Sequence, residues 1–134
     1  MVKVHEYSYI QRVFNKCRDL RAGKDWLGKF DGDTLVSEDS LQVAVRAAGA
    51  VIEACDKVMS NAYKNAFCAV RPPGHHAGVY GPVLNDKQDK RSLSNGFCYI
   101  NNVAVGASYL MNKYSDQIKR IAIIDMDVHH GNGT

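Results

Sequence analysis

The most informative stretch of the sequence is IAIIDMDVHHGNG, which spans residues 121–133. Its first four residues are apolar, and a short apolar run is typical of a strand buried on both faces of a parallel sheet. The run continues directly into Asp125, Asp127, His129 and His130. Because parallel α/β sheets bind ligands beyond the carboxyl ends of their strands, this stretch predicts an α/β fold with a site at that edge.

The acids and histidines after this strand alternate with other residues. Side chains of an extended segment point to alternate faces, so we expect Asp125, Asp127 and His129 on one face and His130 on the other. Carboxylate oxygen with imidazole nitrogen suits Zn²⁺, and equally Fe²⁺ or Mn²⁺. The competing interpretation is an aspartate cap followed by a loop histidine. A metal site is favoured, because two acids and two histidines at a buried strand end are costly without an ion.

A second strand is predicted over residues 66–70, AFCAV, and another pair of histidines follows it. His75 and His76 come directly after the rigid turn Pro-Pro-Gly at 72–74. Histidine is the side chain best matched to proton transfer near neutral pH, although an ordinary loop pair explains this motif equally well in isolation. Since both pairs follow strands of one sheet, we expect them to converge on a single crevice.

Helices are predicted where apolar residues recur three and four positions apart. These regions cover residues 6–21, 38–60 and 98–114, with Ser37 as the N-cap of the second helix. Residues 22–36 and 71–96 are interpreted as loops. At the end of the long loop, Gly96 would let a ligand approach the backbone, and Phe97 would either line an apolar channel or pack in the core. The alternation of helix and strand indicates a βαβ unit in a parallel sheet.

The composition is that of an ordinary globular protein, with 134 residues, 46% of them apolar and 23% charged. That length predicts one domain, and a net charge of +3 is too small to indicate nucleic-acid binding. No apolar run reaches the ~18 residues of a membrane helix, and the N-terminus has no apolar core of the signal-peptide type. Wide spacing of the cysteines favours free, buried thiols in a reducing compartment; they are Cys17, Cys55, Cys68 and Cys98.

Three motifs together resemble the zinc-dependent histone deacetylases of the arginase/deacetylase superfamily. They are RPPGHHA at 71–77, GFCY at 96–99 with NNVA at 101–104, and DMDVHHGNGT at 125–134. Pro-Pro-Gly before the first histidine pair, and Asn132 after the second, are similar to class II enzymes. The resemblance implies a three-layer α/β fold with a parallel sheet. Residues 1–134 would be the N-terminal portion of the catalytic domain, truncated after the first metal-binding motif, with helices around an incomplete sheet.

The resemblance also implies catalytic and metal-binding roles. Asp127 and His129 would bind Zn²⁺, while His75 and His76 would form the general base and acid pair. Asp125 would support His75 and also belong to a structural K⁺ site. The implied reaction is metal-assisted amide hydrolysis, in which an activated water attacks the acetamide and a histidine protonates the departing lysine amine.

The remaining matches concern orientation and substrate binding. Asn132 would orient the second histidine of the first pair, and Gly96 and Phe97 would line the acetyl-lysine tunnel. Asp31, or else Asp33, would be the rim acid that holds the substrate backbone. The implied partners are acetylated lysine side chains of histones or other proteins, in the nucleus or cytoplasm, with no direct binding of nucleic acid or membrane.

The site is expected to be incomplete within these residues. A catalytic zinc normally has three protein ligands and a water, and the resemblance places the third ligand, an aspartate, and an oxyanion-stabilising tyrosine after Thr134. We therefore expect the isolated chain to be inactive and, because an incomplete sheet exposes apolar surface, to self-associate. The alternatives are an acetylpolyamine or other small-molecule amidohydrolase of the superfamily, and a non-catalytic fragment or binding module. Residues 78–95 exceed the family pattern and are interpreted as a solvated insertion near the tunnel mouth.

Overall fold

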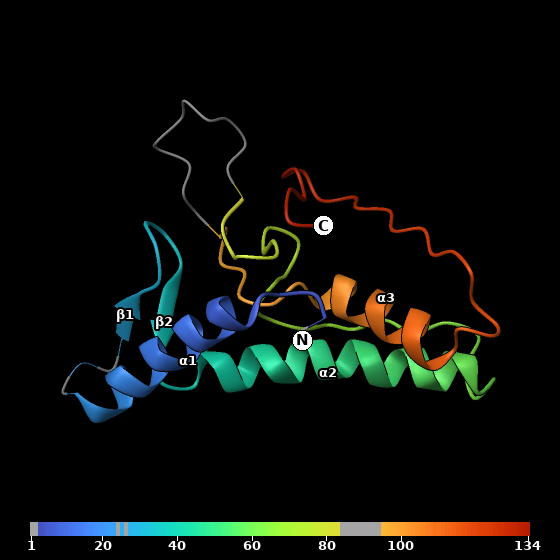
Figure 1. Ribbon diagram of the computed structural model, residues 1–134, viewed down its shortest axis with the longest axis horizontal. Helices are drawn as coiled ribbons and strands as arrows, with labels where there is room; N and C mark the ends of the chain where they lie inside the picture. The colour runs from blue at the N-terminus through green and yellow to red at the C-terminus, as the bar shows by residue number, and fades with distance from the viewer. Residues whose placement is uncertain (1–2, 24, 26, 84–94) are drawn as a thin grey trace.

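The computed structural model describes residues 3–23, 25, 27–83 and 95–134. Helix α1 spans Tyr7–Ala22, α2 spans Ser40–Met59 and α3 spans Asn102–Lys113. The long helix α2 forms the base of the molecule, with α1 towards one of its ends and α3 towards the other (Figure 1). Loop segments form a layer above the helices, and this layer holds the histidine motifs. Most of the predicted insertion, residues 84–94, lies outside the described residues.

All three predicted helices are present. Residues four apart on α1, namely Tyr9, Val13 and Cys17, are buried, which is the pattern of a helix with one apolar face. Helix α3 begins later than the predicted residue 98, because the side chain of Asn101 caps it. The Asn101 side-chain oxygen accepts a hydrogen bond from the backbone N–H of Ala104 at 3.1 Å, which satisfies one of the free donors of the first turn.

The region interpreted as a loop over residues 22–36 contains an antiparallel hairpin instead. Strand β1 spans Leu27–Lys29 and pairs with β2 over Leu35–Ser37. The hairpin is stable because β2 buries Val36 completely in the core while exposing Leu35, an alternation too short to stand out in sequence. Ser37 is therefore not an N-cap. It belongs to β2, its backbone N–H donates to Ser40 Oγ at 2.8 Å, and Asp39 occupies the cap position of α2.

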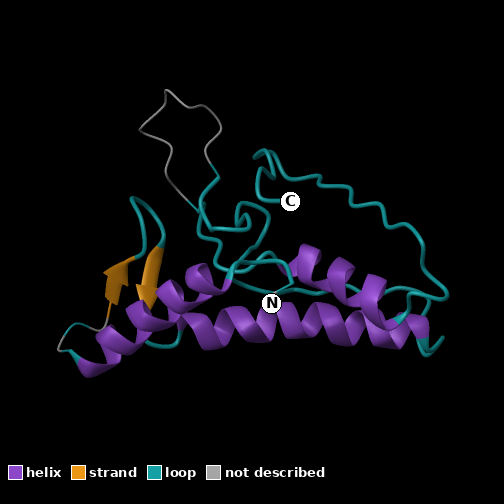
Figure 2. Ribbon diagram, viewed as in Figure 1, coloured by secondary structure: helices purple, strands orange, loops and turns teal. Residues whose placement is uncertain are grey.

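The two predicted parallel strands are not formed. Residues 66–70 and 121–124 run as irregular chain, coloured as loop in Figure 2, and within the described residues no backbone hydrogen bond joins either segment to a neighbouring strand. An apolar strand is stable only when neighbours cover its faces and pair with its edges. Here Phe67 is 93% exposed and Ile124 is 84% exposed. The described part of the chain thus has three helices and a small antiparallel sheet rather than the expected parallel sheet.

The core lies between α1, α2, β2 and the start of α3, and it links the helices to the loop layer above. Tyr9 is the main link, since its hydroxyl donates to the Tyr99 carbonyl at 2.7 Å and accepts from Asn95 Nδ2 at 2.9 Å. Burial raises the pKa of this tyrosine, which keeps the hydroxyl protonated. The other buried apolar side chains packed around it include Val13, Cys17, Val36, Ala44, Ala48, Ile100 and Val105.

All four cysteines are free thiols, as predicted, but their burial differs. Cys17 and Cys98 are buried, whereas Cys55 and Cys68 are only half-buried. Burial raises the pKa of the Cys98 thiol to about 11, so this cysteine is an unreactive core residue rather than a nucleophile. Within the described residues, no helix has both the length and the apolar character needed to span a membrane.

Candidate functional site

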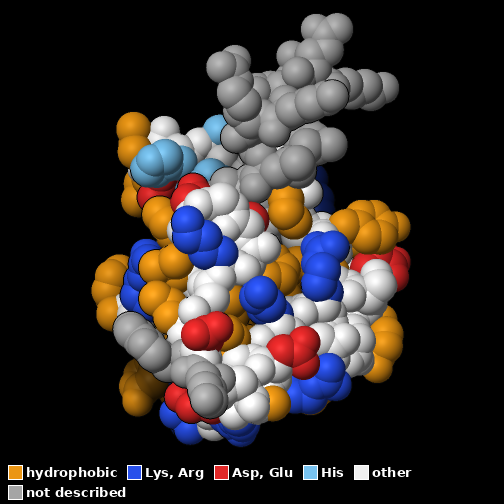
Figure 3. All heavy atoms as spheres, turned by 90° about the vertical axis from the view of Figure 1, so that its left-hand side faces the viewer, with side chains coloured by type: hydrophobic (Ala, Val, Ile, Leu, Met, Phe, Trp, Pro, Cys, Tyr) orange, Lys and Arg blue, Asp and Glu red, His pale blue; other side chains and the backbone are white. Residues whose placement is uncertain are grey.

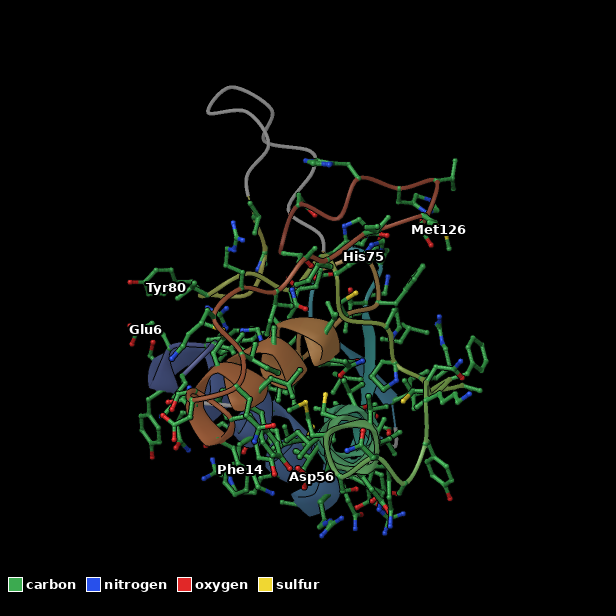
Figure 4. The ribbon with its side chains drawn as sticks, turned by 90° about the vertical axis from the view of Figure 1, so that its right-hand side faces the viewer. Glu6, Phe14, Asp56, His75, Tyr80 and Met126 are labelled. Atoms are coloured by element: carbon green, nitrogen blue, oxygen red, sulfur yellow. The ribbon has the colours of Figure 1, made fainter. Side chains whose placement is uncertain are left out.

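The two histidine motifs come together at one place, as predicted. The turn that follows Gly74 presents His75 and His76, and the segment 131–134 packs directly against the back of this turn. The backbone N–H of Gly133 donates to the His75 carbonyl at 2.8 Å. A Cβ at position 133 would lie 2.5–2.6 Å from backbone atoms of His76 and Ala77, so glycine is required for this close approach. His75 and Met126, both labelled in Figure 4, lie in the loop layer above the helices.

His75 is oriented by a carboxylate. Its Nδ1 lies 2.8 Å from Asp125 Oδ2, and the His75 side chain is only 17% exposed. The other Asp125 oxygen accepts the backbone N–H of Asp127 at 3.1 Å. The hydrogen bond from His75, followed by that of the Asp127 backbone, lowers the pKa of Asp125, so the carboxylate is ionised. An ionised carboxylate only accepts hydrogen bonds, which places a proton on His75 Nδ1 and leaves Nε2 for chemistry.

His76 is oriented by an amide. Its Nδ1 lies 2.6 Å from Asn132 Oδ1, while Asn132 Nδ2 donates to the Val83 carbonyl at 3.3 Å. The second contact decides the orientation of the amide, because only an NH₂ group can donate to a carbonyl. The Asn132 oxygen therefore accepts from His76, and His76 also carries its proton on Nδ1. The rings of His75 and His76 are neighbours, with centroids 4.2 Å apart.

Asp127 and His129 form a third pair, which is hydrogen-bonded within its own turn. Asp127 Oδ1 accepts from the His129 backbone N–H at 2.7 Å and lies 2.8 Å from His129 Nδ1. These two bonds, the backbone bond first, lower the pKa of Asp127 and keep it ionised. Met126 and Val128, which alternate with these two residues along the chain, point away as the alternation predicts, since they are 91% and 92% exposed.

One cavity of about 620 Å³ collects most of the predicted site residues. Figure 3 shows histidine side chains at the upper rim of the molecule with acidic groups beside them. Asp125 lies behind the cavity, where it contacts His75, rather than in its wall. His130 was expected to face away from the other site residues, but it borders the cavity. The chain bends at 127–129, so side chains beyond that point no longer alternate as in an extended segment. The residues lining the cavity are Asp33, Arg71, Pro73, His75, His76, Gly96, Phe97, Asp127, His129, His130 and Asn132.

Gly96 and Phe97 shape the mouth of this cavity through an unusual backbone. Gly96 has φ +51°, and a Cβ there would lie 2.3 Å from His76 Cδ2, so the glycine makes room for the His76 ring. Phe97 also has a positive φ of 66°, and its backbone N–H donates to Thr34 Oγ1 at 3.2 Å. The Phe97 side chain is 52% exposed. Of the two interpretations of Phe97, the core residue is therefore excluded.

The two candidate rim acids occupy different environments. Asp31 accepts the backbone N–H groups of Thr34 and Asn95, each at 2.8 Å, and so holds the hairpin loop against the loop layer. Burial acts to raise the pKa of Asp31, but the backbone donors, Asn95 first, outweigh it and the net shift is downward. Asp31 does not line the cavity, whereas Asp33 does.

The side chains of Asp127 and His129 are of types that bind zinc. Asp127 and His129 supply an oxygen and a nitrogen side by side, and these are donor types that zinc prefers. Among the described residues, however, no group of three histidine, cysteine, aspartate or glutamate side chains is arranged to hold a metal ion. The pair thus fits two of the three protein positions of a catalytic zinc site.

Two contributors to the site were missed in sequence. Arg71 borders the cavity, although the motif around it carried no indication of a separate role. His5, a single histidine near the start of the chain, is 2% exposed. Its Nε2 accepts the Asn101 backbone N–H at 3.0 Å, and its Nδ1 therefore donates to the Gly78 carbonyl at 2.7 Å. No local pattern predicts either residue, because the partners of His5 and most of the cavity lining around Arg71 are distant in sequence.

Comparison with known proteins shows the family of the chain. The family model described as the histone deacetylase domain matches residues 1–134. Type-2 histone deacetylase 2 of Dictyostelium discoideum is 50% identical over 115 residues, which cover 83% of this chain and 6% of that protein. Histone deacetylase clr3 of Schizosaccharomyces pombe is 37% identical over 134 residues, covering 100% of this chain and 18% of that protein. The chain thus spans less than a fifth of either relative.

A solved structure matches the fold. The crystal structure of the HDA15 HD domain superposes with a TM-score of 0.75 at 34% sequence identity. The match covers 98% of this chain and 31% of that domain chain. The arrangement of helices, hairpin and loops described above is therefore that of one part of such a domain.

Proposed function

The chain belongs to the histone deacetylase family, with class II-like features, and on this premise we propose that it supplies part of a catalytic centre for hydrolysis of acetyl-lysine amides. The observation that carries the proposal is the meeting of three pairs at one cavity. His75 with Asp125, His76 with Asn132, and Asp127 with His129 are each held by a hydrogen bond of 2.6–2.8 Å. Two oriented imidazoles beside a potential metal pair are the groups that amide hydrolysis requires.

The partners of the two histidines support a division of labour. Asn132 offers His76 a neutral acceptor, which leaves the Nε2 lone pair free to take a proton from the attacking water. Asp125 offers the corresponding nitrogen of His75 a negatively charged acceptor instead, at 2.8 Å. We assign His76 as the general base, and His75 as the residue that holds a proton near the leaving lysine amine. In each case Nδ1 stays bound to its partner, so the exchanged proton is the one on Nε2.

Asp127 and His129 are the residues that would hold zinc. When bound, zinc supplies polarisation of a carbonyl oxygen and activation of a water molecule. The ionised state of Asp127 suits this role, because a ligand must be deprotonated to coordinate. We propose that a residue outside 1–134 provides the third ligand, as the family resemblance implies, and that these residues form the N-terminal portion of the catalytic domain. The K⁺ site at Asp125 stays a prediction.

Substrate binding is assigned to the mouth of the cavity. Gly96 and Phe97 form the wall against which the aliphatic part of an acetyl-lysine side chain would pack, and the 52% exposure of Phe97 supports this role. We propose Asp33 rather than Asp31 as the acid that accepts a substrate backbone N–H. Asp33 lines the cavity, whereas Asp31 does not.

Substrate comparison with the complete protein that carries this chain tests the proposal. We expect hydrolysis of acetyl-lysine peptides, strong loss of activity with His76→Ala, and little activity on acetylpolyamines. A preference for acetylpolyamines would instead support a small-molecule amidohydrolase, and the absence of both activities would support a binding module. The isolated 134 residues are expected to be inactive. If they bound stoichiometric zinc and hydrolysed acetyl-lysine, the proposed incompleteness of the site would be wrong.

A further inference from the structure

A second hollow of about 380 Å³ lies next to the candidate catalytic cavity, and we call it the flanking pocket. It is lined by β2, the first turn of α2, the turn at Arg71 and the segment 97–99. Leu35, Val43 and Phe97 form its apolar walls, and they are 51%, 44% and 52% exposed. Three large apolar side chains left this open around one hollow form a surface on which an apolar group would be buried favourably.

Buried anchors hold the pocket in shape. Tyr99, which is 4% exposed, lines it and donates its hydroxyl to the Leu35 carbonyl. Thr34 is fully buried and accepts the backbone N–H of Phe97. Two of the three apolar walls, Leu35 and Phe97, are therefore fixed to buried residues of the core. A pocket that exists before binding saves the ordering cost that a flexible surface would incur.

The flanking pocket is continuous with the candidate catalytic cavity. Asp33, Arg71 and Phe97 line both hollows, so the Phe97 ring forms a wall that the two share. The guanidinium of Arg71 makes no hydrogen bond or ion pair with any residue that the structure describes. It is therefore a donor available at the boundary between the hollows, suited to a peptide carbonyl.

An extended substrate peptide would meet both hollows at once. Side chains two residues apart point to the same face of an extended chain and stand about 6.5 Å apart, whereas immediate neighbours point to opposite faces. We propose that the flanking pocket binds an aliphatic or aromatic side chain two residues from the acetyl-lysine, with Arg71 donating to the intervening main chain. This inference rests on the proposed function and adds a sequence preference to it.

A peptide series tests the flanking pocket in the complete protein that carries this chain. The parent peptide has acetyl-lysine between glycines, and leucine replaces one glycine at a time at positions −2, −1, +1 and +2. Leucine at −2 or at +2 is expected to raise kcat/KM about tenfold, because part of its side chain becomes buried, while leucine at −1 or +1 has little effect. Equal rates for all five peptides would overturn the inference but leave the proposed function intact.

A matched pair of variants locates the preference. Val43→Ser is expected to abolish the leucine preference and to leave hydrolysis of the glycine peptide unchanged. Val45→Ser, on the same helix at a residue that is 38% exposed and outside the pocket, is expected to keep the preference. A preference that survives Val43→Ser would overturn the assignment to this pocket.

Loss of self-association in Val43→Ser, with no leucine preference in the wild type, would identify a second copy of the chain as the occupant. Failure to hydrolyse any peptide would contradict the proposed function itself.

Discussion

Asp125 Oδ2 and His75 Nδ1 are 2.8 Å apart, although 50 positions separate the two residues in the chain. The contact joins the segment after 121–124 to the turn after 66–70, and it sets the tautomer of His75. Both segments lie in a layer that has few regular hydrogen bonds of its own. Side-chain pairs of this kind, rather than a sheet, therefore hold the candidate site together within the described residues.

Replacing Asp125 tests this link. Asparagine keeps an acceptor for His75 Nδ1 but loses the charge, whereas alanine loses both. We expect kcat/KM on an acetyl-lysine peptide to fall in the order wild type, Asp125→Asn, Asp125→Ala, with a loss of at least about tenfold in the first step. The exposed Asp116, changed to Asn, is the control and should be silent. Unchanged kcat/KM in Asp125→Asn would show that the charge is not used.

Removal of a metal ligand is the second prediction. Asp127→Ala should lower the zinc content of the complete protein and its deacetylase activity together, and dialysis of the wild type against a chelator should have the same effect. Met126→Ala serves as the control, because that side chain is 91% exposed on the opposite face of the segment. Zinc content is measured by elemental analysis. Full zinc and activity in Asp127→Ala would refute the assignment.

Two glycine substitutions should have opposite effects. Gly96→Ala places a Cβ 2.3 Å from His76 Cδ2 at a φ of +51°, so we expect a displaced His76, lost activity and destabilisation of about 1–3 kcal/mol. Gly49→Ala lies within α2, where a Cβ would meet nothing within 4 Å, and should stabilise by about 0.5–1 kcal/mol. Chemical denaturation and kcat/KM check both. Wild-type activity in Gly96→Ala would be inconsistent with the observed packing.

Stability should depend on pH through His5. Burial lowers the pKa of His5 from 6.5, against a weaker opposing effect of its bond to Gly78. The folded state therefore binds the proton less readily than the unfolded state. The stabilisation is fully present above the unfolded pKa of about 6.5, and it declines as the pH falls below that value towards the lowered folded pKa. Unfolding free energies measured from pH 8 down to about 5 should show a flatter profile for His5→Gln than for wild type. Parallel profiles would argue against a neutral, buried His5.

The exposed apolar segment should drive self-association of the isolated chain. Ile124 and Val128 are 84% and 92% exposed, and their backbone has no neighbouring strand within the described residues. Sedimentation should reveal oligomers that the pair Ile124→Lys and Val128→Lys reduces. Tyr7→Lys, at a residue that is 66% exposed on α1, should not reduce them. A monomeric wild-type chain would contradict this prediction.

The helices and the chemical groups of the candidate site could be predicted from local patterns in the sequence. The spacing of Tyr9, Val13 and Cys17 predicts α1, since helical periodicity is a property of a few consecutive turns. The convergence of His75–His76 with the second pair also followed from the pattern, even though the strands proposed to bring them together are not formed. The motifs therefore predicted correctly that the two histidine pairs lie close together. The parallel sheet expected to bring them together is not formed within the described residues.

Other features depend on distant contacts, which local patterns do not report. The hairpin β1–β2 forms because Val36 finds the core, and the predicted strand at 121–124 fails because nothing described pairs with it. The role of His5 is not visible in the sequence, because its partners, Gly78 and Asn101, lie 73 and 96 positions away. A residue whose role is set by such contacts has no periodic signature.

The amino-acid sequence alone determined which chemical groups are present, their order, and the helices that carry the core. Only the tertiary structure decided which partner each group takes. It pairs His75 with a charged acceptor and His76 with a neutral one, and it directs Asp31 into its own loop while Asp33 lines the cavity. The reason is physical. Residue type and local spacing set the available donors and charges, but hydrogen bonds over 2.6–2.8 Å depend on how the whole chain packs.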